Sequence, residues 1–246
     1  MKKKIIVIHQ PNLFPTIKIL NKIVSGDELV ILDDVQFVKN DIQNRIKFRN
    51  FKNPSKYFWV TASVKKGSSR KKINDVQFFS YEKFKEEFMR NFDSTYKKSP
   101  FHPFLLNYLT ECFSEKFENI SKFNNHCLML LMEQLNIDIK WHLSSDVALP
   151  STCKSDDRLI YLTNYYKGKS YLSGLGGRNY INSTKFDKAG IQLMYHPWEK
   201  PKDSDIEDWD KVSFIDYIAR YGKESLKKYI EEKRTYFDNF EQKWLF

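Results

Sequence analysis

Apolar residues near the start of the chain form two short runs, each of which ends at a cluster of polar residues. The first run covers residues 5–8 and stops at His9, and the second covers residues 29–32. Short apolar runs of this kind are typical of buried strands. Residues 16–24 between them carry apolar side chains at helical spacing, so residues 4–35 predict a βαβ unit with parallel strands.

The rest of the chain continues the alternation of strands and helices. Further strands are predicted at residues 57–64, 138–143, 170–173 and 191–195, and helices within 81–136, at 155–162 and in the tail from 214. Residues 40–53 match no regular element. The pattern predicts an α/β fold with a mostly parallel, Rossmann-like sheet flanked by helices and a helical insertion at about 81–136. We expect the whole chain, 1–246, to form a single domain.

The composition narrows the range of partners. Lys and Arg number 41 against 31 Asp and Glu, and the formal net charge of +10 favours phosphate-bearing partners. The basic residues are spread along the chain, so we expect a phosphorylated small molecule and no nucleic acid. No apolar stretch approaches the roughly 20 residues of a membrane span.

The cysteines and the N-terminal apolar run indicate the compartment. The three cysteines are scattered and form no CxxC pair, so we expect no metal site. Reduced thiols, together with an apolar run that is too short for a signal peptide, favour a cytoplasmic protein.

The residues at the predicted strand ends are the first candidates for chemistry, because ligands of parallel α/β sheets bind at the carboxyl ends of the strands. His9 ends the first strand and is a candidate general base. Asp33 and Asp34 follow the second strand, where one of them is expected to orient His9, accept sugar hydroxyls or bind a cation. The alternatives are a hydrogen-bonded structural histidine and capping of the loop by Asp34.

Three further segments carry polar groups that suit a sugar or a phosphate. A glycine-rich turn follows the strand at 170–173 and favours phosphate binding, although its spacing differs from the dinucleotide fingerprint. His196 ends another strand and is a second acid–base candidate, unless it only shapes a loop with the proline and tryptophan that follow it. The amide-rich segment after Asp34 is either a substrate-binding loop or a solvated polar loop. The candidate substrate-binding residues are Gln10, Asn12, Gln36, Lys39, Asn40, Gln43, Asn44, Arg45, Ser173, Gly174, Gly176, Arg178 and His196.

Three motifs of the chain together resemble the WbqC-like family. They are H-Q-P-N-x-x-P at 9–15, L-D-D-V-Q-x-x-K-N-x-x-Q-N-R at 32–45, and Y-L-S-G-x-G-x-R-x-Y at 171–180. Thr16 stands where members of that family usually have Trp, and the segment 196–198 is shorter than the family pattern, which leaves acceptor specificity open. The resemblance implies a bacterial protein of surface-polysaccharide or sugar-biosynthesis clusters.

The motifs and the resemblance lead to one main functional hypothesis and two alternatives. The main hypothesis is an enzyme that transfers an acyl or aminoacyl group to an amino sugar linked to a nucleotide. The first alternative is ATP-dependent adenylation, because the loop after His9 is similar to the nucleotide-binding turn of nucleotidyltransferases, although their second histidine is missing. The second is a non-catalytic sugar-nucleotide-binding or scaffold protein. The cofactor, the sugar, the donor and the oligomeric state stay open.

Overall fold

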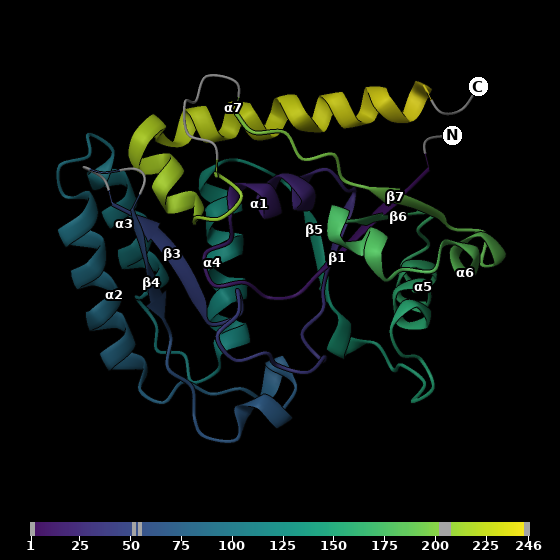
Figure 1. Cartoon of the computed structure of the whole chain (residues 1–246), viewed down its shortest axis with the longest axis horizontal. Helices are drawn as coiled ribbons and strands as arrows, with labels where there is room; N and C mark the ends of the chain where they lie inside the picture. The colour runs from purple at the N-terminus through teal and green to yellow at the C-terminus, as the bar shows by residue number, and fades with distance from the viewer. Residues whose placement is uncertain (1–2, 51–52, 54–55, 202–207, 244–246) are drawn as a thin grey trace.

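The computed structural model of the chain describes residues 3–50, 53, 56–201 and 208–243. A five-stranded sheet lies at its centre, in the order β5-β2-β1-β6-β7, and each neighbouring pair of strands is parallel (Figure 1). The α/β class and the mostly parallel sheet are therefore confirmed, and the arrangement is compatible with a Rossmann-like fold. The strands are β1 (Ile5–His9), β2 (Glu28–Ile31), β5 (Lys140–Leu143), β6 (Ser170–Ser173) and β7 (Gln192–Tyr195).

The predicted βαβ unit at residues 4–35 is present. Helix α1 (Ile17–Val24) connects β1 to β2, and the Thr16 hydroxyl caps it by accepting a hydrogen bond from the backbone N–H of Ile19 at 3.4 Å. The parallel register places His9 beside Ile31. The ends of both strands therefore lie at the same edge of the sheet.

Alternate residues of β1 belong to two hydrophobic cores, because successive side chains of a strand face opposite sides of the sheet. Ile5 and Val7 lie in the larger core, and Ile6 and Ile8 lie in the smaller one. Both faces of the sheet are therefore covered, as parallel sheets require. The larger core includes residues of α1 and α7 (Phe214–Lys243), and the smaller one includes residues of α5 (Asp156–Tyr165) and α6 (Ser183–Lys188).

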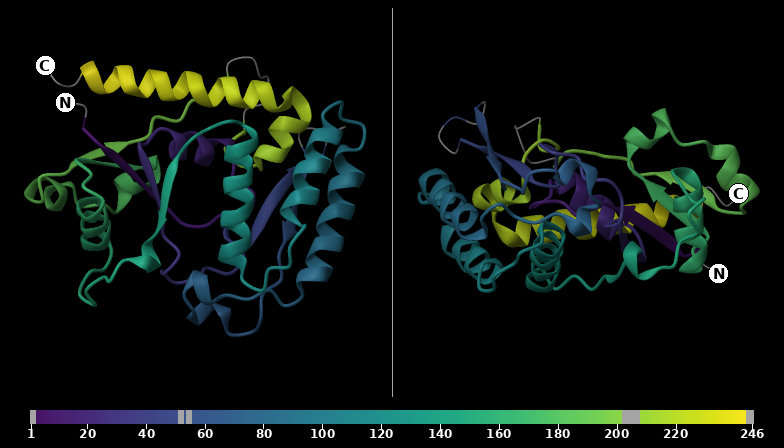
Figure 2. Two further views of the ribbon diagram at one scale, coloured as in Figure 1. Left: turned by 180° about the vertical axis from the view of Figure 1, so that it is seen from behind. Right: turned by 90° about the horizontal axis from the view of Figure 1, so that it is seen from below.

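Three helices lie on the opposite side of the sheet from α5 and α6, with the third of them nearest the sheet (Figures 1 and 2). They confirm the helices predicted within 81–136, and their aromatic residues enclose Phe14 from the loop after β1. The Phe14 ring lies 4.8 Å from that of Phe88 and 5.9 Å from that of Phe123. This packing holds the loop although Phe14 has a φ of 40°, which is unfavourable for a side chain of this size. The helices are α2 (Tyr81–Tyr96), α3 (His102–Cys112) and α4 (Ile120–Gln134).

The sequence analysis predicts only one strand of a second, two-stranded antiparallel sheet. This sheet consists of β3 (Arg45–Arg49), within a segment without an assigned element, and β4 (Tyr57–Thr61), which ends before the predicted residue 64. Ile46 and Phe48 of β3 are buried in the larger core. Basic residues alternate with these two apolar residues, so the segment resembles a polar loop and its strand-like alternation is not recognised in the sequence.

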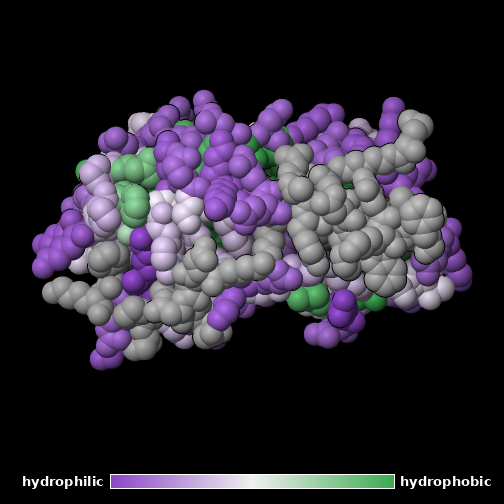
Figure 3. Space-filling view, turned by 90° about the horizontal axis from the view of Figure 1, so that it is seen from above, coloured by the Kyte–Doolittle hydropathy of each residue, from purple (hydrophilic) through white to green (hydrophobic). Residues whose placement is uncertain are grey.

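Helix α7 changes direction at Gly222, whose φ is 81° and whose Cβ, if present, would lie 2.6 Å from Phe101 Cε1. The coloured residues on the face of the molecule seen from above are mostly hydrophilic (Figure 3). Charged pairs one turn apart, such as Lys227 and Glu231 at 3.8 Å, contribute to the polar surface of this helix.

In the part of the chain that the structure describes, no helix has both the length and the apolar character needed to cross a membrane.

Candidate functional site

His9 lies at the carboxyl end of β1, and both of its ring nitrogens have partners. Asn12 Oδ1 lies 2.7 Å from Nε2, and Lys22 Nζ lies 3.0 Å from Nδ1. A lysine ammonium only donates, so we assign Nδ1 as the acceptor and the Nε2–H as the donor to Asn12. The ring is therefore held by Lys22 and Asn12, and not by Asp33 or Asp34 as the sequence analysis expects.

The environment of His9 keeps its imidazole neutral. Burial lowers the pKa of His9 well below its usual value, the charge of Lys22 lowers it further, and the hydrogen bond to Asn12 opposes these effects. The ring is consequently unprotonated at pH 7. This is the form that a general base requires.

Lys22 is a buried lysine that the sequence analysis misses. Its side chain also donates to the backbone carbonyl of Ile8 at 3.3 Å, and it forms no ion pair with a carboxylate among the described residues. Burial lowers its pKa to about 8. Its sequence position, between Leu20 and Ile23, does not predict that it is buried. A lysine at such a position of a helix at the protein surface normally extends its ammonium group into solvent.

A pocket of about 410 Å³ opens beside His9 at the carboxyl edge of the sheet. We call it the His9 pocket. It brings together five of the predicted site residues and adds several that the sequence analysis does not predict. The predicted ones are His9, Gln10, Ser173, Gly174 and Gly176, and the added polar ones are Lys22, Ser155, Asp156, Arg158 and Tyr180.

The glycines that line the His9 pocket differ in the reason for lacking a side chain. A Cβ on Gly177 would lie 2.2 Å from Ser173 Oγ, so packing alone requires a glycine there. A Cβ on Gly174 or Gly176 would meet no atom within 4 Å, and neither residue has a positive φ. Neither packing nor backbone conformation requires those two glycines, which leave bare backbone at the edge of the pocket. The turn that contains them forms a short 3₁₀ helix, Leu175–Asn179.

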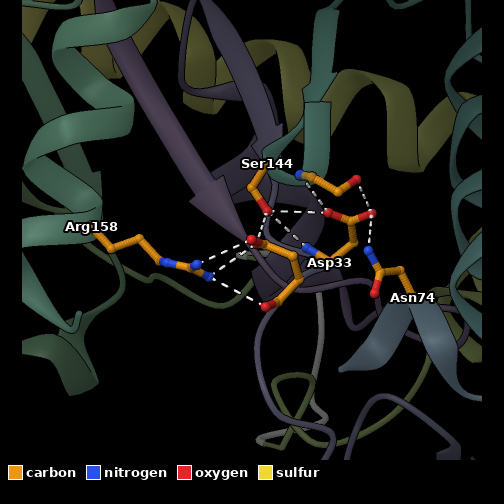
Figure 4. Close-up of polar contacts among 6 residues, drawn as sticks. Asp33, Asn74, Ser144 and Arg158 are labelled. Atoms are coloured by element: carbon orange, nitrogen blue, oxygen red, sulfur yellow. Dashed lines mark hydrogen bonds and ion pairs between the residues drawn. The ribbon is translucent and has the colours of Figure 1, made fainter. Parts of the chain in front are cut away.

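Asp33 and Asp34 are both buried, and each accepts several hydrogen bonds (Figure 4). Asp33 accepts from the Ser145 backbone N–H at 3.0 Å and from its hydroxyl at 2.8 Å. Asp34 accepts two hydrogen bonds from the Arg158 guanidinium, each of 3.0 Å, in a bidentate pair. The Ser144 hydroxyl contacts both carboxylates. These bonds connect the end of β2 to the end of β5 and to α5.

A second pocket, of about 960 Å³, is lined by Asp34 of this cluster, and we call it the Asp34 pocket. Asp34 and Gln36 line it, together with Lys72 and Cys153. Ser155 and Arg158 line both pockets, so the two cavities adjoin at the start of α5.

The amide-rich segment after Gln36 has a mainly structural arrangement. Gln43 donates to Gln10 Oε1 at 2.8 Å, Asn44 donates to the Ala62 carbonyl at 2.9 Å, and both side chains are buried. The other residues of the segment lie outside the lining of the His9 pocket: Asn40 donates its backbone N–H to Asn44 Oδ1, Lys39 is exposed, and the guanidinium of Arg45 stacks on Trp59 at 3.9 Å.

Two further candidates lie near the glycine turn but not in the lining of the His9 pocket. Arg178 stacks over the ring of Tyr195 at 5.1 Å. His196 is buried after β7, and its backbone N–H donates to the Ser173 carbonyl at 2.8 Å. Among the described residues, no three His, Cys, Asp or Glu side chains gather into a group that could hold a metal ion.

Fold and site together define an α/β protein with a parallel sheet and a ligand-sized pocket at the carboxyl ends of β1 and β6. The chain belongs to the WbqC-like protein family, whose model matches residues 10–228. It is similar to the uncharacterized protein Rv1507c of Mycobacterium tuberculosis, with 26% identity over 231 residues that cover 92% of this chain and 96% of that protein. No solved structure shows a significant match.

Proposed function

We propose that the protein is an enzyme that transfers an acyl or aminoacyl group to the amine of a nucleotide-linked amino sugar, for a surface glycan. The observation that carries the proposal is the composition of the His9 pocket, where a neutral imidazole and a buried lysine share about 410 Å³ with two bare glycines. Bare backbone suits close approach of a phosphate. Ser173 lines the same pocket, with its hydroxyl donating to the Gly174 carbonyl at 3.1 Å. Arg178 is not assigned to the phosphate, because it stacks on Tyr195 and does not line the His9 pocket.

In the proposed reaction the sugar amine attacks the carbonyl carbon of the acyl donor. The new C–N bond forms, the bond from the carbonyl carbon to the donor's leaving group breaks, and the leaving group keeps that electron pair. The amine loses one proton, which passes to the His9–Lys22 pair. With a pKa of about 8, Lys22 is a neutral amine in about a tenth of molecules at pH 7, and in that form the pair accepts the proton.

This assignment changes the expected pH dependence of turnover. An unperturbed histidine base would give an inflection near pH 6.5. Since the pKa of His9 lies well below its usual value, the relevant step is loss of the Lys22 proton, and the rate should rise up to about pH 8.

The first experiment tests binding. A broad panel of nucleotide-linked sugars is screened for an increase in the melting temperature of the protein, and Gly176→Ala should weaken the effect without changing the melting temperature of the free protein. If no sugar nucleotide stabilises the wild type, the proposal is wrong. Sugars that bind are then incubated with acyl donors, and with ATP plus a carboxylate. Formation of acylated product without AMP or pyrophosphate supports the proposal, whereas release of AMP or of pyrophosphate supports adenylation.

The second experiment tests the base. His9→Asn should fold, should bind the sugar nucleotide nearly normally, and should lose roughly 10²–10⁴-fold in turnover. A folded, substrate-binding variant with full turnover would exclude His9 as part of the base. Binding without turnover in the wild type would instead indicate a sugar-nucleotide-binding protein.

A further inference from the structure

Asp156 is a charged residue of the His9 pocket that the proposed reaction does not yet use. The residue is buried, with a relative exposure of 6%, and it lines the pocket. Asp156 Oδ2 accepts a hydrogen bond from the backbone N–H of Asn182 at 3.0 Å. Asp156 Oδ1 is buried and has no hydrogen-bond partner. Leaving a buried carboxylate oxygen without a donor is costly, so a donor from a ligand would relieve that cost.

The residue before Asp156, at the start of α5, has an unfavourable backbone conformation. Ser155 has a φ of 49° and a ψ of −123°, a conformation that is unfavourable for a residue with a side chain, and its hydroxyl does not cap α5. Asp157, the next residue, is exposed and accepts from Lys185 Nζ at 2.9 and 3.0 Å. Of two adjacent acids in the same helical turn, one is therefore paired at the surface and the other lines the pocket.

The cationic side chains of the pocket do not satisfy Asp156. Arg158 is engaged by both carboxylate oxygens of Asp34, and Lys22 donates to His9 and Ile8. Among the described residues, neither forms an ion pair with Asp156. The free oxygen thus has a strong preference for a donor, and a cationic donor most of all.

We propose that Asp156 Oδ1 binds the amine of the acceptor and so selects an amine over a hydroxyl at that position. This inference rests on the proposed function, since it assigns one group of the proposed substrate to one residue. In the ammonium form the acceptor donates a charge-assisted hydrogen bond to Oδ1. After it releases one proton to solvent, the neutral amine that attacks the donor still donates an N–H to Oδ1, and the proton lost as the C–N bond forms passes to the His9–Lys22 pair. Asp156 is a specificity-determining residue in this scheme, distinct from the base.

The test uses two probes without a nucleotide, glucosamine 6-phosphate and glucose 6-phosphate, which differ in having an amine or a hydroxyl at carbon 2. Isothermal titration calorimetry at physiological ionic strength should show that the wild type prefers the amine by about 10-fold or more. Asp156→Asn should abolish the preference. The Asn182 N–H requires the amide oxygen, so the amide NH₂ replaces the acceptor in the pocket. Asp157→Asn makes the same chemical change one residue away and should keep the preference.

The outcomes separate this inference from the proposed function. Equal affinity of the wild type for the two probes, absence of binding of either, or a preference that survives in a folded Asp156→Asn protein, would each overturn the role of Asp156. If the Asp156-dependent preference is found but no nucleotide-linked sugar binds, the inference stands and the proposed substrate is wrong. If a nucleotide-linked amino sugar is acylated and Asp156→Asn discriminates as the wild type does, the proposed function stands alone.

Discussion

Two of the regions in which the described structure buries charged side chains differ in whether those side chains have partners. Between β3 and α7, Arg49 contacts Asp216 at 3.2 Å and also Asp208, and the Tyr96 hydroxyl donates to Asp216 at 3.1 Å. In the His9 pocket, Lys22 has no carboxylate partner among the described residues, and Asp156 Oδ1 has no hydrogen-bond partner.

The difference indicates what each region does. A buried ion pair whose members are all satisfied fixes the position of the elements that carry it, and here it attaches the β3–β4 sheet to α7. A buried charge without a partner weakens the fold and is retained where a ligand completes it. The two regions should therefore respond with opposite signs when one charge is removed.

Arg49→Met should give the largest effect on stability. The substitution leaves Asp216 buried without its nearest cation, so we expect the free energy of unfolding to fall by about 3–5 kcal/mol. Urea denaturation followed by circular dichroism measures the change. Arg70→Met removes the same charge from an exposed position and should change stability by less than about 0.5 kcal/mol. Equal effects of the two substitutions would contradict a structural role for the Arg49 network.

The sequence predicts the βαβ unit and the position of His9 because both depend on local pattern. Apolar runs identify β1 and β2, and parallel pairing then requires their ends to meet at one edge of the sheet. Strand β4 is predicted, but β3 is not, because basic residues alternate with Ile46 and Phe48. The antiparallel pairing of the two strands is therefore not predicted either.

The electrostatics of the site could not be predicted, because they depend on contacts between distant parts of the chain. Asp34 is paired with Arg158, which lies 124 residues further along the chain. In the sequence, Asp156 is one of two adjacent acids at the start of a predicted helix, and only the packing around α5 distinguishes it from Asp157. Lys22 carries no local signal of its burial.

Lys22→Met should change stability in the opposite direction from Arg49→Met and by a smaller amount. Lowering the pKa of Lys22 from 10.5 to about 8 corresponds to a penalty of roughly 3 kcal/mol at pH 7. Loss of its hydrogen bonds to His9 and Ile8 offsets part of the gain, at about 1 kcal/mol each. We expect a net stabilisation of roughly 1–2 kcal/mol together with loss of turnover.

The control for Lys22→Met is Lys18→Met, on the same helix. Lys18 is partly exposed and pairs with Asp210 at 3.5 Å, so its removal should change stability by less than about 1 kcal/mol and leave turnover unchanged. The advantage of Lys22→Met should also shrink above pH 8, where Lys22 is neutral in the folded protein but still protonated when unfolded. A destabilised Lys22→Met protein would show that the lysine is satisfied without a ligand.

The smallest expected effect, a pH dependence of stability at His9, tests whether the pocket holds the imidazole neutral. Burial lowers the pKa of His9 in the folded protein, whereas the unfolded chain binds the proton at about pH 6.5. The contribution of His9 to stability is therefore fully present above pH 6.5 and is lost as the pH falls toward the folded pKa, by about 1 kcal/mol per pH unit. Asp216, whose pKa is raised to about 6 mainly by burial, titrates in the same range with the opposite sign.

The quantity to measure is consequently the difference in the free energy of unfolding between wild type and His9→Asn from pH 7.5 to 5, in which the contribution of Asp216 cancels. A difference that shrinks with falling pH supports a neutral His9 beside Lys22, and a constant difference would mean that the imidazole titrates as it does in water.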